Sequence, residues 1–154
     1  MPEVQKKNRC DNQGDEGFGM ITAVDTNVLL DIFLDDPEFS EKSSDMLRRC
    51  IREGKVIACD IVWAETAANF KSEDEFRRIM NSLEIEFSPL KENAAFSAGH
   101  LWKSYREKVP GKTKIIADFL IASHAKHQAE RLLSRDRGFY RGYFKDLVVL
   151  NPAE

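Results

Sequence analysis

Four acidic residues of this 154-residue chain occupy segments where charged side chains are rare. Asp25 ends the β-branched run ITAVD, and Asp136 closes the run LLSRD. Glu65 lies in IVWAETAA and Asp118 in IIADFLIA, each as the only charge of its segment. A carboxylate in apolar surroundings is costly unless it is paired, hydrogen-bonded or bound to a cation. Each acid alone has an ordinary explanation, such as a helix cap or a pair with Lys114, but four together predict a shared site.

A cluster of carboxylate oxygens without histidine or cysteine favours a hard cation, Mg²⁺ or Mn²⁺. Such ions polarise a phosphoryl oxygen and activate water, and two of them about 3.5–4 Å apart clamp both oxygens of a phosphodiester displacement. The residue types therefore predict metal-assisted hydrolysis of a phosphodiester.

Alternating strands and helices are predicted to position these acids. The expected strands cover residues 21–25, 55–59, 85–87, 131–134 and 147–150, and the expected helices cover 27–34, 40–53, 61–70, 72–83, 90–108 and 115–128. Strands separated by helices predict an α/β fold with a central parallel sheet of four to five strands. Ligands of such sheets gather at the carboxyl ends of the strands, where Asp25 and Asp136 are expected.

The length predicts one domain, and the composition (42% hydrophobic, 32% charged) excludes a wholly disordered chain. Residues 1–19 are polar without periodicity, so we expect a flexible leader at 1–19 and a folded domain at 20–154. No apolar run approaches the roughly 18 residues needed to cross a bilayer, and no signal-peptide pattern is present. Three cysteines without a CxxC motif suit a reduced, cytoplasmic protein with no membrane partner.

Charge is unevenly distributed along the chain. Residues 1–100 hold 12 Lys and Arg against 20 Asp and Glu, whereas residues 101–145 hold 11 against 4. A basic third in an acidic protein indicates either a local surface for a polyanion or ordinary solvated helix faces.

Four segments in register resemble the motifs of PIN-domain nucleases. They are VDTNVLLD from Val24, the apolar helix around Glu65, ADFLIASHA from Ala117 and LLSRDRGFY from Leu132. Within that family the chain looks most like the VapC-type toxins of toxin–antitoxin pairs. The resemblance implies a three-layer α/β/α sandwich and an Mg²⁺- or Mn²⁺-dependent endoribonuclease. It also implies a homodimer and inhibition by a small antitoxin protein.

The resemblance also assigns roles to individual residues. Asp25, Glu65, Asp118 and Asp136 would form the catalytic, metal-binding set, with Asn27 and Ser134 as polar supports. Basic residues near the acids would contact the RNA backbone, namely Lys112, Lys114, Arg135, Arg137 and Arg141. For Arg135 and Arg137, neutralisation of Asp136 is an equally good interpretation. The aromatic residues Tyr140, Tyr143 and Phe144 are expected mainly to pack, with base stacking as the alternative.

Three other interpretations remain at this point. The chain could process RNA without an antitoxin, or it could be an inactive RNA- or protein-binding domain, although its complete acid set counts against the latter. A phosphatase of the haloacid dehalogenase type would need a second aspartate where Asn27 stands.

His124 and His127 are read as ordinary helix residues rather than zinc ligands. The apolar set Phe33, Phe39, Met46 and Leu47 is either a core face or a clamp for a partner helix.

Overall fold

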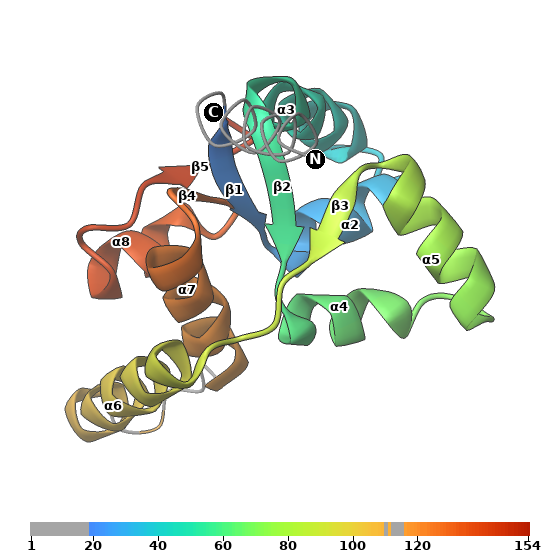
Figure 1. Cartoon of the computed structure of the whole chain (residues 1–154). Helices are drawn as coiled ribbons and strands as arrows, with labels where there is room; N and C mark the ends of the chain where they lie inside the picture. Colours follow the sequence, from blue (N-terminus) through green and yellow to red (C-terminus); the bar gives the residue numbers. More distant parts are fainter. Residues whose placement is uncertain (1–18, 110, 112–115) are drawn as a thin grey trace, which may run out of the picture.

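Five parallel strands form the centre of the molecule (Figure 1). The computed structural model describes residues 19–109, 111 and 116–154. The sheet has the order β3-β2-β1-β4-β5. Its strands are β1 (Met20–Val24), β2 (Gly54–Ala58), β3 (Ile85–Phe87), β4 (Arg131–Leu133) and β5 (Val149–Leu150). The parallel sheet predicted from the alternating pattern is confirmed.

Helices connect successive strands and cover the sheet. They are α2 (Thr26–Phe33), α3 (Ser40–Glu53), α4 (Asp60–Ala67), α5 (Glu73–Ser82), α6 (Glu92–Lys108), α7 (Ile116–Gln128) and α8 (Arg137–Tyr143). Helices α3 and α4 pack against β2, and α7 packs against β1 and β4. Figure 1 shows α6 and α7 at the lower left of the strands and α4 and α5 to their right, and α4 also contacts α7. The predicted three-layer α/β/α architecture is therefore confirmed.

Most element boundaries lie within two residues of the predicted ones, and the larger differences have local causes. The strand predicted for 147–150 begins only at Val149, because the amide of Leu147 donates to the carbonyl of Phe144 in a turn. The helix predicted to reach residue 70 ends at Ala67, where the side chain of Asn69 donates to the carbonyl of Glu65.

The helices of the described part of the chain start in different ways. Ser72 caps α5, since its Oγ accepts from the amide of Glu75 at 3.2 Å. Asp60 is the first residue of α4, and Cys59 occupies its cap position. Helix α8 was not predicted, because its seven residues, RGFYRGY, contain two glycines, which weaken local helical propensity.

The chain reverses direction along the sheet between β1 and β4. It runs from β1 outward through β2 to β3, then returns to place β4 on the other side of β1. Strands β1 and β4 pair through Val24 and Leu133, and the amide of Asp25 donates to the carbonyl of Leu133 at 2.9 Å. The residues after these two strands must therefore meet at one edge of the sheet, the switch point where ligands of such folds bind.

Apolar side chains from both helix layers and the sheet form one core. Cys50 and Cys59 are buried free thiols within it. Residues 1–18 of the predicted leader and Cys10 lie outside the described residues. Among the described helices, none is long and apolar enough to cross a membrane.

The start of β2 admits no side chain at Gly54. A Cβ built there would approach the backbone atoms of Met20 and Gly19 far inside normal contact distance, and backbone cannot move aside cheaply. We expect Gly54→Ala to lower the free energy of unfolding by about 1–3 kcal/mol, the usual cost of overpacking. Urea denaturation would measure this loss.

Gly99 provides a matched control, because a Cβ there meets nothing within 4 Å and the residue lies inside α6. Gly99→Ala should raise stability by about 0.5–1 kcal/mol. A Gly54→Ala protein as stable as the parent would contradict this account of the β1–β2 contact.

Candidate active site

Asp25 is buried at the end of β1, with only 6% of its surface exposed. Its Oδ1 accepts from the amide of Thr26 at 2.7 Å, so the residue is also the N-cap of α2. Its Oδ2 accepts from two hydroxyls, Ser134 Oγ at 2.7 Å and the Tyr140 phenol at 2.9 Å. Donors from three segments thus hold the carboxylate: the first residue of α2, the residue after β4, and α8.

The pKa of Asp25 is raised above its usual value, and burial is the largest cause. The hydrogen bonds from Ser134, Tyr140 and Thr26 oppose that shift, while the nearby carboxylate of Asp118 adds to it. Burial disfavours the charged form, and a like charge does the same. A cation beside Asp25 would stabilise the ionised carboxylate against both effects.

Glu65 is connected to Asp25 through a single residue. Thr26 gives its amide to Asp25 and its hydroxyl to Glu65 Oε1, the latter at 2.8 Å. Glu65 itself is an exposed residue of α4, so its carboxylate reaches the site from the solvent side. Helices α2 and α4 are therefore joined by a polar contact beside the β1 end.

Asp118 and Asp136 lie near enough to the buried Tyr140 phenol to act on it electrostatically. Asp118 lies in the first turn of α7, and Asp136 is the N-cap residue of α8. The pKa of Tyr140 is raised strongly, first by burial, then by Asp25, and further by Asp118 and Asp136. The negative charge of three carboxylates from three segments of the chain thus acts on one tyrosine hydroxyl.

The side chains approach one another without forming a closed metal-binding group. Within the described ranges, no three His, Cys, Asp or Glu side chains are close enough together to hold a metal ion. The donor chemistry nevertheless fits a hard cation, because the acids supply oxygens only and negative charge is concentrated around Asp25 and Tyr140. The acids therefore match the expected ion in the type of ligand that they supply.

The segment after β4 is fixed by a small polar network. Besides donating to Asp25, Ser134 Oγ accepts from Asn27 Nδ2 at 3.4 Å and from the amide of Asp136 at 3.0 Å. Asn27 Oδ1 accepts from the amide of Arg135 at 3.2 Å. Asn27 and Ser134 thus connect the first turn of α2 to the loop that carries Asp136.

The basic residues singled out from the sequence differ in their surroundings. The guanidinium of Arg135 donates to both carboxylate oxygens of the buried Asp31, at 2.7 and 2.8 Å, and lies 4.1 Å from the ring centre of Phe39. Arg137 forms an ion pair with Glu154, and Arg141 is exposed. The pairs with Asp31 and Glu154 give both arginines structural partners that the sequence did not suggest. Lys112 and Lys114 lie outside the described residues.

Sequence reasoning missed the roles of Thr26 and Tyr140. Thr26 follows Asp25 directly and carries a hydroxyl, a signal that was present but not used. Tyr140 was assigned to packing or base stacking, and its complete burial excludes stacking on an exposed base. The same holds for buried Phe144, whereas Tyr143 is 36% exposed.

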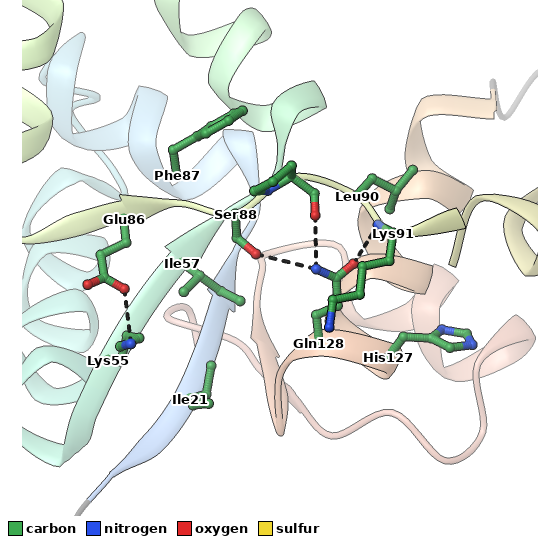
Figure 2. A pocket seen from close by; sticks show the side chains of 11 residues that line it. Ile21, Lys55, Ile57, Glu86, Phe87, Ser88, Leu90, Lys91, His127 and Gln128 are labelled. Atoms are coloured by element: carbon green, nitrogen blue, oxygen red, sulfur yellow. Dashed lines mark hydrogen bonds and ion pairs between the residues drawn. The ribbon is translucent and has the colours of Figure 1, made fainter. Parts of the chain in front are cut away.

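A hollow of about 570 Å³ lies apart from the acids, beneath the connection from β3 to α6 (Figure 2). Gln128 bridges this connection to the end of α7. Its amide nitrogen donates to the Pro89 carbonyl at 3.0 Å, and its Oε1 accepts from the Lys91 amide at 3.0 Å. One turn earlier, His124 Nε2 lies 2.9 Å from Ser88 Oγ. These contacts hold α7, and with it Asp118, in place on the sheet.

Comparison with protein-family models identifies the family to which this chain belongs. Residues 22–145 match the model of the PIN domain. The chain belongs to the PIN domain family. The resemblance drawn from the four sequence motifs is thereby confirmed, and the matched range includes all four acids. A comparison with curated proteins finds no match.

Solved structures show the same PIN fold. VapBC2 from Rickettsia felis, bound to a promoter DNA fragment, matches with 22% identity and a TM-score of 0.65, over 86% of this chain and 98% of that one. VapBC-1 from nontypeable Haemophilus influenzae matches with 16% identity and a TM-score of 0.67, over 88% of this chain and 100% of that one. A toxin–antitoxin complex from Klebsiella pneumoniae matches with 19% identity and a TM-score of 0.64, over 86% of this chain and 98% of that one. At these identities the likeness concerns the fold.

The Asp31–Arg135 pair generates a stability prediction. Arg135→Met would leave the Asp31 carboxylate buried with only the Ser43 hydroxyl, at 2.7 Å, as a side-chain donor. Breaking a buried pair typically costs 3–5 kcal/mol, and because the Arg135 side chain is 28% exposed we expect about 2–3 kcal/mol. Urea unfolding measures the loss. Arg141→Met, at an exposed position of α8, serves as the control and should change stability by under about 0.5 kcal/mol. Equal losses in the two variants would refute the structural role of the Asp31–Arg135 pair.

His124 should make the fold sensitive to acid. Burial lowers its pKa below the ordinary value of 6.5, so the unfolded chain takes up a proton before the folded one. The stability contributed by neutral His124 is therefore complete above pH 6.5 and lost as the pH falls toward the folded-state pKa. Unfolding free energies measured on both sides of pH 6.5 should show this slope, and His124→Gln should flatten it. A similar flattening in the exposed control His100→Gln would contradict the assignment.

Proposed function

We propose that this PIN-domain protein is a metal-dependent endoribonuclease and the toxin of a toxin–antitoxin pair. The observation that carries the proposal is the gathering of acids at the β1–β4 switch point. Asp25, Asp118 and Asp136 act on one buried phenol, and Glu65 joins Asp25 through Thr26. Family membership supports the nuclease class, because PIN domains are nucleases.

Asp25 and Asp118 are proposed as the main ligands of Mg²⁺ or Mn²⁺, with Glu65 and Asp136 completing the set. The bound ion supplies Lewis acidity toward a phosphoryl oxygen and lowers the pKa of water. Glu65 is placed on the exposed side, where it can orient the attacking water. Ser134 and Tyr140 keep the Asp25 carboxylate fixed while substrate binds and leaves.

Single-stranded or structured RNA would approach from the exposed side of the acids. Arg141 is exposed for contact with phosphates, and Lys112 and Lys114 belong to the same basic third of the chain. Arg135 and Arg137 would contribute positive potential while held by Asp31 and Glu154. Such contacts would position the backbone without reading its sequence.

The toxin assignment rests on the solved relatives, which are toxin–antitoxin complexes. We propose a small antitoxin protein and a second copy of the chain as partners. Of the predicted apolar clamp, Leu47 is a core residue and Phe39 lies under Arg135, whereas Phe33 and Met46 are only partly buried. Phe33 lines a hollow of about 340 Å³ with Leu34, Phe70 and Ile79. An apolar partner segment would fit this surface.

An RNA-processing nuclease without an antitoxin and an inactive binding domain are the alternatives. Inhibition by the product of a neighbouring small open reading frame would distinguish the toxin from the processing enzyme. Metal-dependent cleavage would exclude the inactive domain.

The central test is cleavage of a panel of structured RNAs, single-stranded RNAs and single-stranded DNAs by the full chain. We expect Mg²⁺ or Mn²⁺ to support cleavage of RNA and EDTA to abolish it. Asp118→Asn should lower the rate by about 100-fold or more, because a lost metal ligand removes several kcal/mol of transition-state stabilisation.

Asp74→Asn, an exposed acid of α5, serves as the matched control and should cleave like the parent. Cleavage that survives Asp118→Asn would refute the site. Cleavage of DNA alone would refute the RNA assignment, and RNA binding without cleavage would favour the inactive domain.

A further inference from the structure

Two hydroxyl groups donate to the same oxygen of Asp25. Ser134 Oγ lies 2.7 Å and the Tyr140 phenol 2.9 Å from Oδ2, whereas Oδ1 accepts from the Thr26 amide at 2.7 Å. A carboxylate oxygen has about two lone-pair positions. The two hydroxyls therefore fill Oδ2, and Oδ1 keeps one position beyond its bond from the amide.

The phenol of Tyr140 is held firmly enough to fix the carboxylate. Tyr140 is fully buried, and its ring packs against Phe139 and Phe144 with centroid distances of 5.2 and 6.5 Å. Its amide donates to the carbonyl of Asp136 at 3.4 Å, so α8 sets the position of the ring relative to the acids. This packing limits the movement of the hydroxyl that donates to Asp25.

We propose that Tyr140 is a positioning residue of the metal site: with Ser134 it holds Oδ2 of Asp25 and leaves Oδ1 to bind the cation. Asp25 then binds the ion through one oxygen, and rotation of its carboxylate is blocked by two donors. This inference rests on the proposed function, because it concerns the ion that the four acids are proposed to hold. It extends the ligand set by naming the oxygen used and the residue that selects it.

Ser134 alone would fix Asp25 less well. Its hydroxyl also accepts from Asn27 and from the Asp136 amide, so its orientation depends on the loop after β4. Tyr140 comes from α8 and adds a second donor to the same oxygen of Asp25. Supports of this kind beside metal ligands typically contribute 10- to 100-fold to metal affinity.

The test measures Mn²⁺ binding by isothermal titration calorimetry, without substrate. We expect Tyr140→Phe to weaken Mn²⁺ binding by about 10-fold or more. Tyr143→Phe removes a hydroxyl from the same helix and keeps its ring, and it should bind Mn²⁺ like the parent. Equal affinities of the parent and Tyr140→Phe would overturn the inference, whereas a parent that binds no Mn²⁺ would overturn the proposed function itself.

A second measurement uses the unaltered tyrosine, in case Tyr140→Phe does not fold. Mn²⁺ binding next to Asp25 must change the surroundings of the Tyr140 phenol. We expect saturation with Mn²⁺ to produce a tyrosine signal in the near-ultraviolet difference spectrum of the parent and of Tyr143→Phe alike. Binding without any such signal in either protein would overturn the inference.

Discussion

The burial of one carboxylate at the end of β1 constrains the rest of the structure. Asp25 is almost inaccessible, and burial raises its pKa. An ionised group in that position needs donors from all sides. Those donors come from α2, from the residue after β4 and from α8, so three elements must be correctly placed before the acid is satisfied.

The topology makes this arrangement possible. Placing β4 beside β1 brings residues more than 100 positions apart to one edge of the sheet, where Ser134 donates to Asp25. Hydrogen bonds and an ion pair outside the site then orient the elements that carry the acids. The Asp31–Arg135 pair ties the loop after β4 to α2, and Gln128 and His124 tie α7 to the connection before α6. The site is thus supported by contacts that lie outside it.

Stability and proposed activity make opposite demands at this edge. Negative charge from Asp118 and Asp136 adds to the cost of ionising Asp25 or Tyr140. The fold accepts this cost where a cation and a phosphate are expected to bind, and compensates with a dense apolar core elsewhere. Phe139 and Phe144 pack around the Tyr140 ring. They serve stability by completing the core, and they serve the proposed activity by fixing the position of the phenol.

The sequence by itself determined the α/β class and the order of most elements, because these depend on local periodicity. It also singled out the four acids as candidates, because an isolated charge in an apolar segment is costly. It could not determine α8, whose helical state depends on tertiary packing of Tyr140 and Phe144 rather than on local propensity. The partners of Asp25 and Arg135 were likewise decided only by the tertiary structure. Hydrogen bonds between residues distant in sequence depend on which strands become neighbours, and no local pattern records that choice.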